Sequence, residues 1–169
     1  MTEINAETQT PIEVCKYMVS MVPSNTKTVL EPTPGSGNLV RVLKKKYKVI
    51  APTNFFEWKQ TWVDCVVMNP PFSRNETNLN GAPAEVLKLS GTKTGYYFLF
   101  KAMDLSDNII AIMPWYFIIN SKSRVDQLMR FGLVSITNLS RTVFKKVRVQ
   151  MCVIRLKRGY TGKVEFLQL

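Results

Sequence analysis

The segment that most constrains the fold covers residues 63–72, which read VDCVVMNPPF and join an apolar run to a stiff corner. The apolar run predicts a buried strand. Each proline fixes φ at about −65° and lacks a backbone donor, and Pro71 also restricts Pro70. The Asn69 oxygen, the Pro70 carbonyl and the Phe72 ring therefore stand together at the strand end, which suits a flat ring that carries an amine. A proline turn that only ends a strand is the plainer interpretation.

Length and composition indicate one domain and exclude several kinds of chemistry. The chain has 169 residues, of which 46% are hydrophobic and 21% charged, as in ordinary globular proteins. Histidine is absent, which excludes Ser-His and Cys-His nucleophiles and argues against zinc. Cys15, Cys65 and Cys152 lack metal-ligand spacing, so we predict no metal site, and the two that lie in apolar strand-like runs are expected in the core. Without an apolar run of about 20 residues or a signal-like start, we expect a cytoplasmic protein that does not enter a membrane.

Positive charge is concentrated in the last third of the chain. Lysine and arginine number 23 against 12 acids, a formal charge of +11, and no acid occurs between Asp126 and Glu165. The basic residues of that interval are Arg130, Arg141, Lys145, Lys146, Arg148, Arg155, Lys157, Arg158 and Lys163. Such an excess favours binding to a polyanion such as nucleic acid, although a merely soluble basic surface has the same composition.

Apolar strand-like runs alternate with helical stretches, which predicts an α/β fold with a mostly parallel sheet and antiparallel members at its C-terminal end. The expected strands are 28–30, 47–50, 63–68, 108–113, 134–139, 149–156 and 164–167. The expected helices are one that starts at Thr10 (N-cap) and Pro11 (first position), then 39–46, 96–104 and 123–131. Residues 73–95 have no clear period and predict a long loop. No linker divides residues 1–169, so we expect one domain.

Residues 28–39, which read TVLEPTPGSGNL, predict a second ligand-binding turn. A short strand leads into a glycine-bearing turn and a helix start, and open sheets bind ligands beyond the carboxyl ends of their strands. The spacing differs from G-x-G-x-x-G, and Glu31 at the strand end favours a cationic or amine-bearing ligand over a pyrophosphate. A plain strand-to-helix turn accounts for the same residues equally well.

Together, these motifs resemble those of a known family. The sequence EPxxGxG at 31–37, followed by NPPF at 69–72, resembles the amino-methyltransferases that use S-adenosylmethionine. The order of helix, glycine turn and NPPF strand is similar to the gamma-type adenine-specific DNA methyltransferases of restriction–modification systems. Residues 109–114 resemble the next core strand, and residues 143–156 the closing β-hairpin. The resemblance implies a Rossmann-like class I methyltransferase sheet, S-adenosylmethionine as cofactor, and methylation of the N6 amine of adenine in DNA.

The resemblance also implies roles for individual residues. Three would be catalytic, accepting the hydrogens of the target amine or stacking on the base: Asn69, Pro70 and Phe72. Ten would contact the cofactor, with Glu31 on its methionine amino group and the Asn54-Phe55 pair on its adenine: Thr10, Pro11, Glu31, Pro32, Thr33, Gly35, Gly37, Asn54, Phe55 and Asn69. Five would contact the substrate: Pro71, Phe72, Trp115, Lys145 and Lys146.

The chain departs from the family after its second strand. Residues 51–53 read Ala-Pro-Thr where the family has an acid for the ribose hydroxyls, and Glu57 is the only acid nearby. Only residues 51–68 separate this second strand from Asn69. One strand–helix unit of the family is therefore expected to be missing or collapsed. We see no separate target-recognition domain, so we expect a homodimer or a specificity partner. Such a minimal form fits a bacterial or phage-infected cell.

Two alternatives to DNA methylation stay open. The same chemistry could act on RNA or on a protein glutamine amide, although amide-methylating relatives usually have tyrosine at the position of Phe72. The other alternative is a non-catalytic module that keeps the fold and binds nucleic acid. The missing second-strand acid favours this module, and the intact NPPF sequence at 69–72 argues against it.

Overall fold

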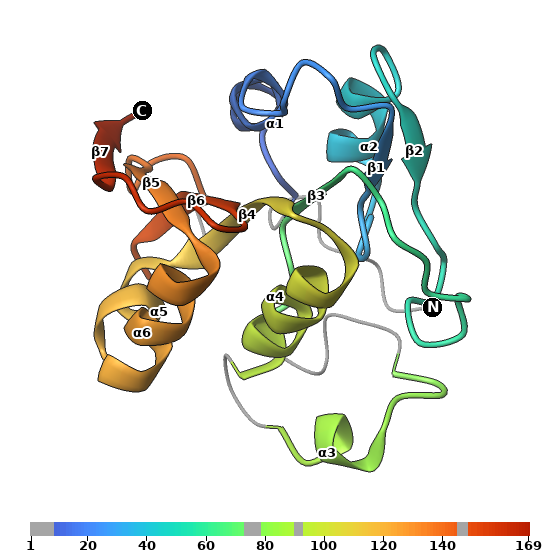
Figure 1. Cartoon of the computed structure of the whole chain (residues 1–169). Helices are drawn as coiled ribbons and strands as arrows, with labels where there is room; N and C mark the ends of the chain where they lie inside the picture. Colours follow the sequence, from blue (N-terminus) through green and yellow to red (C-terminus); the bar gives the residue numbers. More distant parts are fainter. Residues whose placement is uncertain (1–8, 73–78, 90–92, 145–148) are drawn as a thin grey trace.

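Seven strands form one sheet in the order β2-β1-β3-β4-β6-β5-β7, in a computed structural model that describes residues 9–72, 79–89, 93–144 and 149–169 (Figure 1). The strands are β1 Thr28–Leu30, β2 Lys48–Ile50, β3 Cys65–Met68, β4 Asn108–Pro114, β5 Leu133–Asn138, β6 Met151–Lys157 and β7 Glu165–Gln168. The first four run parallel, β6 lies antiparallel between β4 and β5, and β7 pairs parallel with β5. The predicted mostly parallel sheet with an antiparallel C-terminal hairpin is confirmed.

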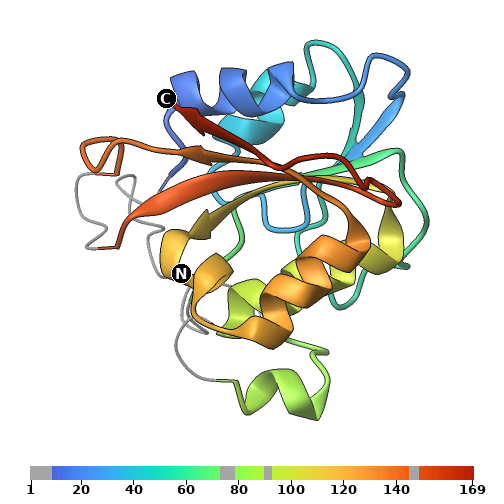
Figure 2. The same ribbon diagram turned by 60° about the vertical axis from the view of Figure 1, so that its left-hand side comes forward.

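Helices cover both faces of this sheet (Figures 1 and 2). One face carries α1 Ile12–Ser20 and α2 Asn38–Leu43; the other carries α4 Lys93–Leu105, α5 Trp115–Ile119 and α6 Lys122–Phe131, with α3 Ala84–Leu87 farther from the sheet. Successive side chains of a strand point to opposite faces, so β3 feeds two cores. Val67 packs with the α1 side chains, whereas Val66 packs with the α4 side chains.

The connection from β2 to β3 is unusually simple. Residues 51–64 contain turns but no helix or strand, and Val63 N–H donates to the Leu105 carbonyl at 2.9 Å. β2 is consequently the last strand on its side of the described sheet. No strand–helix unit lies between β2 and β3, as the short interval 51–68 predicted.

The predicted loop over residues 73–95 is wrong in part. Within its described residues lie α3 and the first turn of α4. A four-residue helix such as α3 is too short to give a periodic pattern, and only Val86 is buried on it. The Lys93-Thr94-Gly95 start of α4 contains residues with low helix propensity, and packing of the following apolar residues stabilises the helix.

The three cysteines are free and buried, as expected of small core residues. Burial raises the pKa of Cys65 to about 12, which keeps this thiol protonated and unreactive. In the part of the chain that the structure describes, no helix is long and apolar enough to cross a membrane.

Candidate active site

The carboxyl ends of β1, β3 and β4 meet at one edge of the sheet. Leu30 pairs with Val66, and Met68 pairs with Ala111, so the residues that follow these strands are neighbours in space. Glu31 follows β1 directly and Asn69 follows β3. The two residues that sequence motifs single out, 38 positions apart in the chain, therefore stand side by side where open parallel sheets bind their ligands.

Glu31 is a buried acid held by its own turn. Its side chain is 2% exposed, and its Oε1 accepts hydrogen bonds from the Thr33 N–H at 2.9 Å and the Thr33 hydroxyl at 3.3 Å. Burial raises the pKa of Glu31 to about 8, although the bonds from Thr33 and from the Asn69 backbone N–H oppose this shift. No cationic side chain of the described residues forms an ion pair with it. A positively charged ligand group would stabilise the ionised carboxylate.

Thr33 and Thr10 connect Glu31, Asn69 and α1. The Thr33 hydroxyl also lies 3.4 Å from the Asn69 carbonyl, and the Asn69 amide donates to the Thr10 hydroxyl at 3.1 Å. The predicted N-cap role of Thr10 is wrong, because Pro11 occupies that position and no side chain caps α1. The Thr10 hydroxyl bonds Asn69 instead, and the Thr10 carbonyl accepts from Asn38 at 3.0 Å.

Two oxygens at the NPPF corner bond no residue that the structure describes. Neither Asn69 Oδ1 nor the Pro70 carbonyl accepts a hydrogen bond from any described residue. Pro70 and Pro71 are buried, and each lacks an N–H that could compete for these acceptors. Asn69 itself is partly exposed, so its oxygen is accessible and this corner can accept hydrogens from a ligand.

The glycine turn, residues 34–37, lies between Glu31 and the start of α2. Gly37 N–H donates to the Pro34 carbonyl at 2.8 Å, and both Gly35 (φ +53°) and Gly37 (φ +87°) adopt the left-handed backbone that favours glycine. Gln9, which sequence analysis missed, covers this turn. Its Oε1 accepts from the Ser36 N–H at 3.2 Å, and a Cβ at Gly35 would lie 3.0 Å from its Nε2. Pro32 is buried beneath the turn.

Phe72 is held by a residue that sequence analysis also missed. The half-buried ring of Phe72 lies on Gly95 in the first turn of α4, where an added Cβ would be 2.9 Å from Phe72 Cδ1 and 3.4 Å from the Pro71 carbonyl. Only glycine allows this approach of helix and ring. An isolated glycine inside a helical stretch is the signal that could have suggested a close contact here.

Asn54 and Phe55 are buried at the end of β2, and both have protein partners. Asn54 Oδ1 accepts from the Phe56 N–H at 3.0 Å, and its amide donates to the Asn80 carbonyl at 2.9 Å. The Phe55 ring is 4% exposed and packs against Phe98 with centroids 5.3 Å apart. These contacts tie the β2–β3 connection to α4. Between the end of β2 and Glu57 the chain has no acid, and Glu57 is exposed beside Gly81.

Three predicted substrate contacts remain: Trp115, Lys145 and Lys146. Trp115 starts α5 after β4, and its half-buried ring packs edge-on against Phe166 of β7, centroids 5.8 Å apart. Lys145 and Lys146 lie outside the described residues, so their placement stays a prediction.

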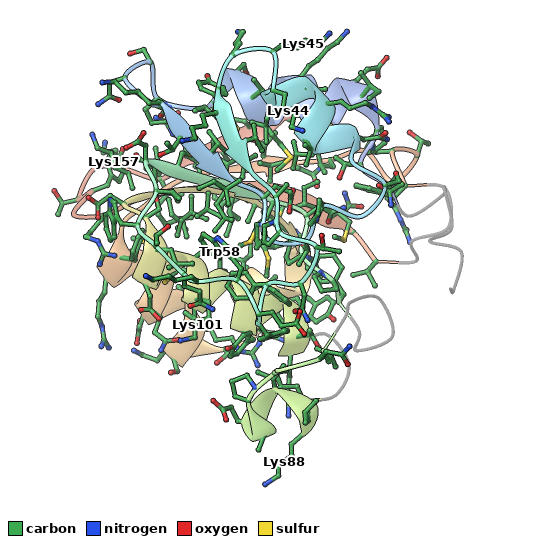
Figure 3. The ribbon with its side chains drawn as sticks, turned by 90° about the vertical axis from the view of Figure 1, so that its right-hand side faces the viewer. Lys44, Lys45, Trp58, Lys88, Lys101 and Lys157 are labelled. Carbon is green, nitrogen blue, oxygen red and sulfur yellow. The ribbon has the colours of Figure 1, made fainter. Side chains whose placement is uncertain are left out.

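Within the part of the chain that the structure describes, basic residues lie on more than one side of the protein. Figure 3 shows Lys44 and Lys45 beside α2 and Lys88 at the end of α3, on opposite sides of the protein. Arg141 follows the carboxyl end of β5, on the edge that carries Asn69, and is exposed. Lys157 ends β6 opposite Asn108, and is therefore at the other edge of the sheet.

No family model and no curated protein matches the chain, whereas many solved structures share its fold. A proposed class I S-adenosylmethionine-dependent methyltransferase from Listeria monocytogenes has a TM-score of 0.70 at 15% identity, over 99% of this chain and 68% of that one. The type I restriction–modification methyltransferase subunit from Streptococcus thermophilus has a TM-score of 0.68 at 16% identity, over 96% of this chain and 47% of that one. The chain has a methyltransferase fold.

A third structure extends this likeness. The modification subunit of a proposed type I restriction enzyme from Vibrio vulnificus has a TM-score of 0.65 at 17% identity, over 95% of this chain and 46% of that one. The chain thus spans about half the length of both restriction–modification subunits. At these low sequence identities, the likeness shows that the proteins share an arrangement of strands and helices.

Proposed function

We propose that this chain transfers a methyl group from S-adenosylmethionine to the exocyclic N6 amine of adenine in DNA. The observation that carries the proposal is a pair of oxygens that bond no described residue, Asn69 Oδ1 and the Pro70 carbonyl, beside the buried Glu31 carboxyl. A primary amine has two hydrogens to donate, and this corner offers two acceptors.

The residues around Glu31 fit the methionine end of this cofactor. A buried carboxyl with no cationic partner among the described residues suits the α-ammonium group, and the turn through Gly35 and Gly37 lets backbone approach the ligand closely. Thr10, Pro11, Pro32 and Thr33 surround the same position, whereas Asn54 and Phe55 are proposed to line the adenine end. Bound S-adenosylmethionine would supply a methyl group on a positively charged sulfur.

The amine of adenine is a poor nucleophile because its lone pair is delocalised into the ring. Asn69 Oδ1 and the Pro70 carbonyl would each accept one hydrogen, which turns the nitrogen toward tetrahedral geometry and aims its lone pair at the methyl group. Phe72, supported by Gly95 and backed by Pro71, would stack on the base. Holding the reacting groups in this geometry supplies most of the acceleration, so no prior general base is needed.

Several features support DNA as the substrate. The formal charge of +11 favours a polyanion, and two similar structures are described as restriction–modification subunits. In duplex DNA the base must leave the helix, at a cost of a few kcal/mol that stacking on Phe72 would partly offset. Trp115, Lys145 and Lys146 are proposed to contact the nucleic acid, and a second copy or a specificity partner is proposed to supply sequence recognition.

Incubation with methyl-labelled S-adenosylmethionine and separate DNA, RNA and protein substrates tests the proposal. We expect label in N6-methyladenine from DNA after nucleoside analysis. Label found only in RNA or only in protein glutamine would show that the chain methylates that substrate instead of DNA.

A non-catalytic nucleic-acid-binding module is the second candidate, favoured by the acid-free sequence 51–56 after β2. DNA binding without methyl transfer to any substrate, and without measurable cofactor binding, would establish it. Cofactor binding in calorimetry would exclude it.

A further inference from the structure

A cavity of about 350 Å³ lies between α3, α4 and α6. This volume is within the range of about 300–1,000 Å³ that is common for small-molecule sites. Six of its lining residues are Leu89, Lys93, Tyr96, Tyr97, Phe100 and Arg124. We name this cavity the α4 pocket, and nothing in the proposed methyl transfer uses it.

Aromatic faces and cations occur together in the α4 pocket. The Phe100 and Tyr96 rings are nearly parallel, with centroids 5.7 Å apart and an angle of 13°. The Arg124 guanidinium lies 4.4 Å from the Tyr96 ring centre and donates to Asn120 Oδ1 at 2.9 Å, which fixes its orientation. Lys93 at the start of α4 is exposed. Stacking surfaces flanked by cations are typical of single-stranded nucleic-acid sites.

The same helix turn connects the α4 pocket to the NPPF corner. Lys93 and Tyr96 line the pocket, while Gly95 between them supports the Phe72 ring. The buried Thr94 hydroxyl in this turn bonds to no described residue. A strand whose target base stacks on Phe72 would therefore pass the start of α4, where the positive charge of Lys93 favours a phosphate.

We propose that the α4 pocket binds a second nucleobase of the polynucleotide, close to the nucleotide whose base enters the NPPF corner. Tyr96 is buried between Phe100 and Arg124, so the base stacks against the partly exposed rings of Phe100 and Tyr97, and its phosphate faces Lys93 and Arg124. Glu85 and Gln127, which also line the pocket, offer hydrogen-bonding groups to the base edge. This inference rests on the proposed function in one respect only, namely that the substrate is a polynucleotide.

The first test measures affinity without the cofactor, by fluorescence anisotropy at low salt. The probe is a labelled single-stranded oligonucleotide with one adenine among thymines. Phe100→Leu keeps the apolar packing and removes the stacking face, so we expect about tenfold weaker binding, and Lys93→Ala should weaken it severalfold. Lys101→Ala (Figure 3) removes the same charge two turns farther along α4, outside the pocket, and should change affinity less than twofold.

The second test locates the base. Removing one base at a time from the probe should weaken wild-type binding at a position near the adenine, and Phe100→Leu should be insensitive to that removal. Equal sensitivity of the wild-type protein and the variant, or equal losses for Lys93→Ala and Lys101→Ala, would overturn the proposal. Competition by a free nucleoside monophosphate with unchanged polynucleotide affinity in Phe100→Leu would also overturn it, in favour of a mononucleotide site. These readouts contain no methyl transfer, so the pocket and the enzymatic proposal can fail separately.

Discussion

The two ends of the candidate cofactor site differ sharply in construction. At the β1–β3 end, Glu31, Thr33, Asn69 and Thr10 form one hydrogen-bonded network around a buried carboxyl. At the β2 end, the strand leads into Ala-Pro-Thr at 51–53 without an acid, and no further strand lies beyond it among the described residues.

This difference indicates where binding free energy must come from. The polar groups of Asn54 at the β2 end are already bonded to Phe56 and Asn80, so a cofactor adenine would meet mostly apolar surface there. Among the described residues, the β1–β3 end has a carboxyl without a cationic partner and two oxygens that accept no hydrogen bond. We therefore expect cofactor affinity to depend on the methionine end far more than on the ribose.

The largest effect should come from Glu31→Gln. Leaving a buried ammonium group without its carboxylate costs about 3–5 kcal/mol, so affinity for S-adenosylmethionine should fall at least about 100-fold in calorimetry. The matched control is Glu57→Gln at an exposed acid. Its affinity for S-adenosylmethionine should stay within about threefold of the wild-type value. Comparable losses of affinity in both variants would contradict a dominant role of the methionine end. Glu57 would then be the substitute for the missing ribose acid.

A smaller effect should appear with pH. The pKa of Glu31 is raised to about 8 by burial, so in the free protein at neutral pH the carboxyl is mostly protonated. An ammonium ligand requires the ionised form, so affinity should rise about tenfold per pH unit between about pH 6 and 7.5, and binding should release about one proton. Calorimetry in buffers of different ionisation enthalpy measures that proton, and its absence would contradict the role of Glu31.

The stability of the free protein should change with pH in the opposite direction to its cofactor affinity. Because the folded-state pKa of Glu31 lies above its ordinary value of 4.5, the free protein gains stability from this group at low pH and loses that contribution as pH rises toward about 8. Glu31→Gln should remove this part of the pH dependence in denaturant unfolding curves.

The smallest effect should come from restoring the missing acid. Ala51→Asp places a carboxylate directly after β2, where two ribose hydroxyls could donate to it, and hydrogen bonds to charged groups contribute about 1.5–3 kcal/mol. Since the new side chain must also be ordered, we expect about a fivefold gain in affinity. Thr53→Asp, at an exposed position two residues farther, is the control. A loss with Ala51→Asp would show that the cofactor does not approach β2.

The sequence predicted the sheet, and its motifs assigned both Glu31 and Asn69 to one cofactor site, because strands and motifs are local patterns. Apolar runs define the strands, and parallel strands bring their carboxyl ends to one edge. The contacts of Gln9 with Gly35 and of Gly95 with Phe72 join segments far apart in the chain, so no local pattern encodes them. Thr10 was assigned to a cap because its local position suits one, whereas a tertiary partner, Asn69, bonds its hydroxyl.

Asn69→Ala tests the central claim most directly, with N6-methyladenine counted in DNA and cofactor binding measured on the same protein. The account predicts that methylation falls below detection while affinity for S-adenosylmethionine changes less than about threefold, since Glu31 and the glycine turn remain. Thr10→Val removes the hydroxyl that Asn69 bonds and separates positioning from catalysis, because it should slow transfer without abolishing it. Undiminished methylation in Asn69→Ala, or equal loss of binding and transfer, would contradict the account.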